Sequence, residues 1–145
     1  MSSEQIPQPV VIDTNIVLDL LLFRDPSTVA LAQALNRGAL RWYATQAMRD
    51  ELQRVLTYPA MQAWLARPGA DDVAAILAQF DRLSQWHAEV PTAAPRCSDP
   101  DDQKFIDLAL CLNALLLSKD QAVLRLRPAL GARGATVARS FSPAA

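Results

Sequence analysis

The feature that most constrains this sequence is a short apolar run that ends in an acid near the start of the chain. Residues 10–12 are Val-Val-Ile, Asp13 follows directly, and a second apolar stretch covers residues 16–23. The β-branched run predicts a buried strand, and the second stretch predicts a helix packed against it. A carboxylate at the end of so apolar a strand would lose its hydration unless a cation or a helix N-terminus faces it. Asp13 is therefore the first candidate functional residue.

The alternation of strand and helix continues along the chain. The hydrophobic pattern predicts further strands at residues 40–44, 86–90, 114–118 and 135–139. Caps, prolines and glycines predict helices at about residues 26–37, 46–58, 60–66, 70–85 and 101–113, with a short helix after Asp120. Strands that alternate with helices over short connections are typical of an α/β fold. We expect a mostly parallel sheet of about five strands, covered by helices on both faces.

Length and composition favour one domain spanning residues 1–145. The chain has 145 residues, of which 51% are hydrophobic, and shows no repeat, linker or low-complexity tract. A chain of this length buries roughly two-thirds of its unfolded surface, so its core needs no disulfide or metal staple. We expect residues 1–9 and 142–145 to be flexible tails.

The residue inventory excludes several kinds of chemistry. His87 is the single histidine, which argues against histidine-based metal sites and against a Ser/His/Asp triad. Cys97 and Cys111 lack the spacing of a zinc site or a disulfide framework. The polar N-terminus and the absence of a long apolar run give no sign of a signal peptide or membrane span. The expected location is the cytoplasm.

The predicted helix at residues 46–58 carries two adjacent acids that point in different directions. Glu51 lies three residues after Met48 and four before Val55, which places it at the apolar stripe. Asp50 lies four residues before Arg54 on the solvated side, where a surface ion pair is expected. An inward carboxylate is costly without a partner, so Glu51 is the functional candidate.

The acidic turn at residues 99–102 has two interpretations. Asp99 and Asp101 suit a helix start, where a cap and the helix dipole favour acids, and this explains them without any function. Asp102 lies three residues before Phe105 and shares the buried face of the same helix. Asp107 falls one position off that stripe and is expected at the surface. Asp102 is therefore the candidate functional residue, while Asp99 and Asp101 remain candidate additional ligands.

Four carboxylates are thus expected to point inward or toward one edge of the sheet: Asp13, Glu51, Asp102 and Asp120. Asp120 follows a predicted strand, although a plain helix cap explains it too. Ligand sites of such sheets lie beyond the carboxyl ends of the strands. Several ionised carboxylates share a small space only with raised pKa values or a bound cation, and an all-oxygen set selects Mg²⁺ or Mn²⁺. Such an ion can activate water and offset charge at a phosphodiester.

With these positions in order, the chain resembles the PIN-domain ribonucleases from Val10 to about Phe141. The family's first motif corresponds to Asp-Thr-Asn at residues 13–15, and its helical acid to Glu51. Its third motif corresponds to Asp-Pro-Asp-Asp-Gln-Lys-Phe at residues 99–105, a variant found in a bacterial and archaeal, VapC-like branch classed as toxins. Its fourth corresponds to Ser-Lys-Asp at residues 118–120. No motif is specific alone, whereas the ordered set of four is a fairly strong signal.

The resemblance implies a three-layer α/β/α fold and a Mg²⁺- or Mn²⁺-dependent endoribonuclease, a phosphodiester hydrolase that acts on single-stranded RNA. It also implies the toxin of a toxin–antitoxin pair, with a cognate antitoxin as a partner. By resemblance, the metal ligands or the residues that hold the metal-bound water are Asp13, Glu51, Asp102 and Asp120. Asn15 and Ser118 would orient them.

An acidic pocket repels RNA, so the binding energy has to come from its rim. Residues 121–145 contain four arginines and no acid, and we expect Arg125 and Arg127 to contact phosphates. A solvated arginine face without a role is the alternative. Apolar surface on the helices between residues 60 and 83 predicts a homodimer, a higher oligomer or an antitoxin site. Trp42, Trp64 and Trp86 are expected to be core or interface anchors.

Two other functions remain open. Residues 13–17 are similar to the signature of haloacid-dehalogenase-like phosphatases, which predicts phosphomonoester hydrolysis. Asn15 argues against that enzyme, because its mechanism needs an acid two residues after the nucleophile and an amide cannot donate the proton. A non-catalytic binding module on a PIN scaffold is the second alternative, since a fold alone does not establish activity.

Overall fold

The computed structural model describes residues 6–92 and 95–143, and confirms the α/β class with a parallel sheet. The strands are β1 Gln8–Ile12, β2 Leu40–Ala44, β3 Ser84–Trp86, β4 Leu115–Leu117 and β5 Thr136–Ala138. The α-helices are α1 Thr14–Leu21, α2 Val29–Asn36, α3 Gln46–Val55, α4 Pro59–Leu65, α5 Val73–Leu83, α6 Gln103–Leu112, α7 Gln121–Leu124 and α8 Arg127–Gly131. Two 3₁₀ turns, η1 Pro26–Thr28 and η2 Pro100–Asp102, precede α2 and α6.

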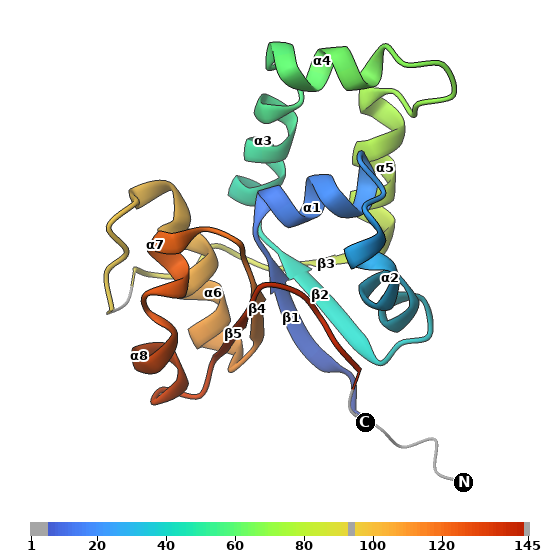
Figure 1. The fold of residues 1–145 in the computed structure, drawn as a ribbon. Helices are drawn as coiled ribbons and strands as arrows, with labels where there is room; N and C mark the ends of the chain where they lie inside the picture. Colours follow the sequence, from blue (N-terminus) through green and yellow to red (C-terminus); the bar gives the residue numbers. More distant parts are fainter. Residues whose placement is uncertain (1–5, 93–94, 144–145) are drawn as a thin grey trace, which may run out of the picture.

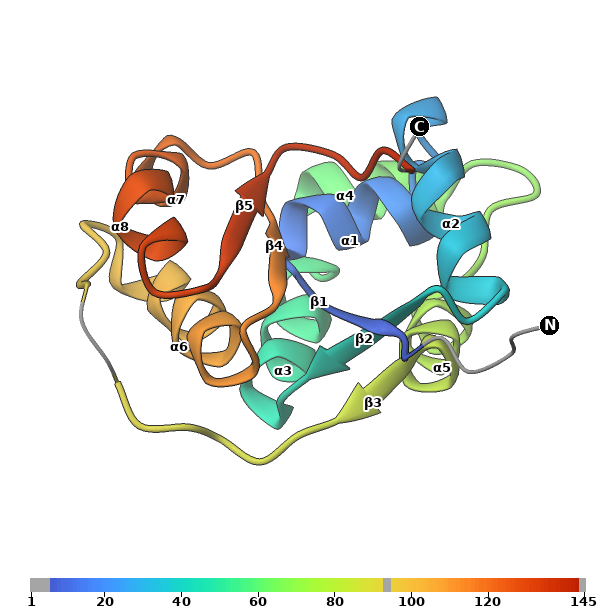
Figure 2. The ribbon, with the colours of Figure 1, turned by 90° about the horizontal axis from the view of Figure 1, so that it is seen from below.

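The five strands lie in the order β3-β2-β1-β4-β5, and each adjacent pair is parallel. From β1 the chain first moves outward through β2 to β3 and then returns to β4 and β5 on the other side. Because parallel crossovers are right-handed, the two directions place their helices on opposite faces. Figures 1 and 2 show α6, α7 and α8 together on one side of the sheet, with α1, α2 and α5 on the other. The order reverses between β1 and β4, where ligand sites of such sheets form.

Burial on both faces explains why the central strands are apolar throughout. Val10 and Val11 point to opposite faces of β1, and both are fully buried. Trp42 of β2 is also buried and meets Phe80 of α5 edge to face, with ring centroids 4.9 Å apart. The core is therefore continuous from the sheet into the helical layer.

Side-chain caps set the starts of several helices. Thr45 accepts a hydrogen bond from the Met48 N–H at the start of α3, as the sequence predicts (3.4 Å). Asp72 caps α5 through the Ala75 N–H (2.8 Å). Helix α5 consequently begins at Val73, three residues later than predicted.

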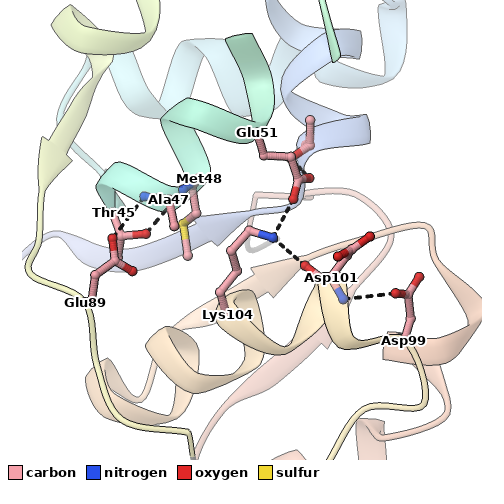
Figure 3. A network of polar contacts seen from close by, with 9 residues as sticks. Thr45, Ala47, Met48, Glu51, Glu89, Asp99, Asp101 and Lys104 are labelled. Atoms are coloured by element: carbon pink, nitrogen blue, oxygen red, sulfur yellow. Dashed lines mark hydrogen bonds and ion pairs between the residues drawn. The ribbon is translucent and has the colours of Figure 1, made fainter. Parts of the chain in front are cut away.

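The predicted strand at residues 86–90 is misplaced. Helix α5 ends at Leu83 and the chain enters β3 at once, where Ser84 pairs in register with Trp42. The strand therefore covers residues 84–86 and the following residues form no strand. Glu89 in this following segment accepts a hydrogen bond from the Ala47 N–H (2.9 Å), which ties the segment to the start of α3 (Figure 3).

The expected N-terminal tail at residues 1–9 is too long, because β1 begins at Gln8. Of the expected tails, residues 1–5 and 144–145 lie outside the described part of the chain. None of the helices described is both long and apolar enough to cross a membrane.

Candidate active site

The carboxyl ends of β1 and β4 meet at the point where the strand order reverses. Asp13 directly follows β1 and is buried, and Ser118 directly follows β4 and is fully buried. The Ser118 hydroxyl donates a hydrogen bond to Asp13 Oδ2 (2.7 Å) and accepts one from the Asp120 N–H (3.1 Å). One hydroxyl thus fixes the position of Asp13 relative to the turn that carries Asp120.

Three further carboxylates gather beside this edge. Oxygen atoms of Asp99, Asp102 and Asp120 all lie within 4.8 Å of one another. Asp99 is positioned by a hydrogen bond from the Asp101 N–H (3.0 Å), and Asp120 by one from the Ala122 N–H (2.9 Å). Both carboxylates therefore cap short turns, and both also face Asp102. The helix-cap explanation and the functional explanation are compatible for each of them.

Asp102 is the most strongly perturbed acid of the group. Its side chain is 6% exposed. Burial, a hydrogen bond with the Asp120 carboxyl and the negative charges of Asp13, Asp120 and Asp99 raise the pKa of Asp102 to about 8. Burial and the charges of Glu51 and Asp120 also raise the pKa of Asp13, while the bond from Ser118 opposes that rise. Without a cation, these carboxylates therefore repel one another, and Asp102 keeps its proton to an unusually high pH.

Glu51 reaches the same region from α3, but its oxygens are engaged by protein donors. The Thr14 hydroxyl donates to Glu51 Oε2 (2.5 Å), and the Lys104 ammonium forms an ion pair with Oε1. Lys104 also donates to the backbone carbonyl of Asp101 (2.5 Å). Figure 3 shows Lys104 extending from α6 toward Glu51, between the two helices.

The donor set suits a hard divalent cation. Asp102 Oδ2 is buried and has no hydrogen-bond partner among the described residues, although a buried carboxylate oxygen is normally satisfied. Carboxylate oxygens are the ligands that Mg²⁺ and Mn²⁺ prefer. A cation between Asp99, Asp102 and Asp120 would satisfy this oxygen and offset their repulsion. The residues present therefore fit the binding of such an ion.

A family model described as a PIN domain matches residues 9–122, which is well over half of the chain. The chain belongs to the PIN domain family. PIN domains are generally nucleases that depend on divalent metal ions, and the acidic cluster fits that chemistry. A search of curated proteins returns no match.

The structure separates the two candidate additional ligands of the PIN-domain site, Asp99 and Asp101. Asp99 lies within the carboxylate group, whereas Asp101 is exposed and contributes its backbone. Asn15 is exposed, and no side-chain hydrogen bond among the described residues links it to the acids that it was expected to orient. Its neighbour Thr14 donates a hydrogen bond to Glu51 instead. Thr14 and Lys104 stand inside the first and third motifs, but apolar periodicity gave no reason to single them out.

Asp107 corrects a prediction. It is 5% exposed rather than at the surface, and its Oδ1 accepts a hydrogen bond from Gln103 Nε2 (2.9 Å). Gln103 also binds the Pro95 carbonyl and the Cys97 N–H, so the segment before η2 covers this part of α6. Asp50 is exposed as expected, and its carboxylate accepts a hydrogen bond from Gln46 (2.9 Å) rather than pairing with Arg54 as predicted.

The two predicted RNA-binding arginines of the PIN domain lie next to the acidic group in sequence and are both exposed. Arg125 follows α7, the helix that Asp120 caps. Arg127 Nε donates to the Val137 carbonyl of β5 (3.1 Å). Arg127 therefore also joins α8 to the edge strand, a structural role that the sequence did not indicate.

Proposed function

We propose that this PIN domain is an endoribonuclease that uses Mg²⁺ or Mn²⁺ to hydrolyse phosphodiester bonds of single-stranded RNA in the cytoplasm. The observation that carries the proposal is the group of Asp99, Asp102 and Asp120, in which the buried Asp102 Oδ2 has no partner among the described residues. An all-carboxylate site of this kind suits charge stabilisation at a phosphodiester.

Each acid has a distinct role in this mechanism. Asp99, Asp102 and Asp120 would hold the divalent ion. When bound, that ion lowers the pKa of a water molecule and offsets the negative charge of the phosphodiester. Asp13 adjoins this group and is fixed by Ser118, so it would orient the attacking water and accept its proton. Glu51 adds negative charge beside Asp13 and is itself fixed by Thr14 and Lys104.

Substrate binding is assigned to the basic rim. The acidic group repels RNA phosphates, so Arg125 and Arg127 would supply the attraction from the adjoining C-terminal segment. Asp13 and Asp120 lie near the start of that segment, which would place the scissile phosphate close to bound phosphates. Contacts of this kind position RNA without reading its sequence.

The biological role that we propose is the toxin of a toxin–antitoxin pair, with a homodimer or higher oligomer as the working form. The support is the Asp-Pro-Asp-Asp-Gln-Lys-Phe motif at residues 99–105 together with membership of the PIN domain family. Induced expression in a bacterial host should then arrest growth, and Asp102→Asn should abolish the arrest. Growth that is unaffected by the wild-type protein at matched expression would contradict the toxin role.

The activity itself is tested by incubating the protein with single-stranded RNA in the presence of Mn²⁺ or EDTA. Wild type should cleave only with metal, and Asp13→Asn or Asp102→Asn should reduce the rate by at least about 100-fold. Asp50→Asn is the matched control, because Asp50 is an exposed acid next to Glu51 and should leave the rate unchanged. Equal cleavage by wild type and Asp13→Asn would refute the mechanism.

The same assay separates the alternatives. A phosphomonoester should not be hydrolysed, because Asn15 replaces the acid that the phosphatase needs and because the chain belongs to the PIN domain family. Binding of RNA without cleavage at any tested metal concentration would favour the non-catalytic module.

A further inference from the structure

Lys104 is a cation beside the carboxylates of the candidate active site. Its side chain is 23% exposed, and its ammonium contacts both Glu51 Oε1 and the Asp101 carbonyl. The Glu51 side chain is 13% exposed, and its other oxygen accepts the Thr14 hydrogen bond. Glu51 Oε1 and Asp102 Oδ2 are both buried without a hydrogen bond, but Glu51 Oε1 is ion-paired with Lys104, whereas no ion pair among the described residues involves Asp102.

The position of Lys104 in its helix is unfavourable by itself. Lys104 is the second residue of α6, where the positive end of the helix dipole disfavours a cation. A lysine side chain also loses conformational entropy when it is fixed. The Lys104 ammonium is instead held by its contacts with Glu51 and the Asp101 carbonyl and lies 4.9 Å from the Phe105 ring centroid, and of these three partners only Glu51 carries a negative charge.

The carboxylates of the site thus form two groups, which differ in whether a cation of the protein neutralises them. Around Glu51, the negative charge is already met by an ammonium that belongs to the protein. None of the ion pairs among the described residues involves Asp99, Asp102 or Asp120, and Asp102 Oδ2 is buried without a hydrogen bond. A divalent ion could reach Glu51 Oε1 only by displacing Lys104.

We propose that Lys104 takes the place of a second metal ion beside Glu51, so that the pocket binds one divalent cation, held by Asp99, Asp102 and Asp120. Glu51 is then not a direct metal ligand, and Lys104 is a positioning residue that acts through it. This inference rests on the proposed metal-dependent function and defines the number of ions that it uses.

The test counts Mn²⁺ ions bound to the purified protein, by calorimetry and by electron paramagnetic resonance of the free ion. Wild type should bind one ion per chain. Lys104→Met removes the charge but keeps an unbranched side chain, so Glu51 should be free to bind a second ion and the count should rise to two. Lys104→Arg retains the charge, so this variant should bind one ion, as wild type does.

Glu51→Gln and Asp102→Asn separate the two parts of the pocket. Glu51→Gln should keep one ion with an affinity within about threefold of wild type, since Glu51 does not contact it. Asp102→Asn should weaken binding by at least about 10- to 100-fold, since losing even a hydrogen-bond partner of a metal ligand has an effect of this size. Because these readouts need no RNA, they stand or fall independently of the ribonuclease assay.

Arg49→Met is the control for a general charge effect. Arg49 lies on α3, as Glu51 does, but its ion pair is with Asp81 (2.8 Å) and not with Glu51. The number of bound ions should therefore stay at one. Two ions on the wild-type protein, or a single ion on folded Lys104→Met, would overturn the proposal. If Lys104→Met does not fold, the wild-type count and the Glu51→Gln affinity still decide the matter.

Discussion

Ser118 and Asp13 are 105 positions apart in the chain and are joined by a 2.7 Å hydrogen bond at the meeting point of β4 and β1. The same hydroxyl also accepts the Asp120 N–H. Ser118 therefore connects Asp13 to the turn that carries Asp120.

Ser118→Ala should weaken both the fold and the site. The substitution leaves the buried Asp13 carboxylate without its hydroxyl donor, which costs about 1.5–3 kcal/mol in the free energy of unfolding. The pKa of Asp13 should rise further, because the bond from Ser118 is the larger of the two hydrogen bonds that lower it. Urea unfolding measures the stability change, with the exposed Ser140→Ala as the control. A change of less than about 0.5 kcal/mol for Ser118→Ala would contradict the assigned role.

Asp102 should make the metal-free protein less stable as the pH rises. Its pKa is about 8 in the folded protein, against 3.8 for an unperturbed aspartate. The folded state binds the proton more tightly than the unfolded state, so stability falls between about pH 4 and pH 8 and then levels off. Asp102→Asn removes this penalty and should raise the Tm at about pH 7 by several degrees, while it abolishes activity.

The measurement is thermal unfolding in EDTA at about pH 5 and about pH 8. The difference in Tm between the two pH values should be smaller for Asp102→Asn than for wild type, and Asp50→Asn should behave as wild type. Added Mn²⁺ should remove most of the wild-type penalty, because the ion replaces the proton. A wild-type protein that is more stable at the higher pH in EDTA would refute this prediction.

The tryptophans should separate into structural and dispensable positions. Trp42 is 1% exposed and packs edge to face on Phe80, so Trp42→Ala should cost about 3–5 kcal/mol. Trp86 of the edge strand β3 is 65% exposed, and Trp86→Ala should change stability by less than about 0.5 kcal/mol in the monomer. Chemical denaturation at low protein concentration compares them. A large loss for Trp86→Ala under these conditions would contradict this prediction, whereas a loss seen only at high protein concentration would indicate an interface that includes β3.

The alanine variants of Arg125 and Arg127 should differ in their effect on protein stability but not in their effect on RNA binding. Each contact with a phosphate adds to the salt dependence of binding, so alanine at either position should reduce the slope by about 1. Arg127→Ala also removes the bond to the Val137 carbonyl and should cost about 1 kcal/mol, whereas Arg125→Ala should leave the Tm unchanged. Unchanged salt slopes for both variants would remove the proposed rim contacts.

Hydrophobic periodicity predicted which acids of the site point toward the interior from their own helices. The helical spacing of Asp102 relative to Phe105 correctly indicated burial, and the apolar stripe of α3 correctly placed Glu51 toward the interior. Both inferences use only neighbours within one helix. The same reasoning wrongly placed Asp107 at the surface. Asp107 is covered by the segment around residues 95–97, and the hydrophobic pattern of α6 does not determine the path of that segment.

The contacts that the sequence did not reveal are those between elements. Nothing in residues 84–90 indicates which of them pairs with β2, since an edge strand is defined by its neighbour. The Thr14 and Lys104 contacts with Glu51 likewise depend on how α1, α3 and α6 converge. A polar residue near a helix start has a local explanation, so its long-range partner is visible only in the folded protein.

The bond between Ser118 and Asp13 has a consequence for how the protein becomes active. A chain under synthesis presents Asp13 early, but the partner that fixes it emerges only after most of the remaining residues. Closing a loop of this length is entropically costly, and every acid of the pocket lies on or within it or just beyond its end. The acidic group therefore cannot assemble on a nascent chain before Ser118 and Asp120 have emerged and β4 has joined the sheet.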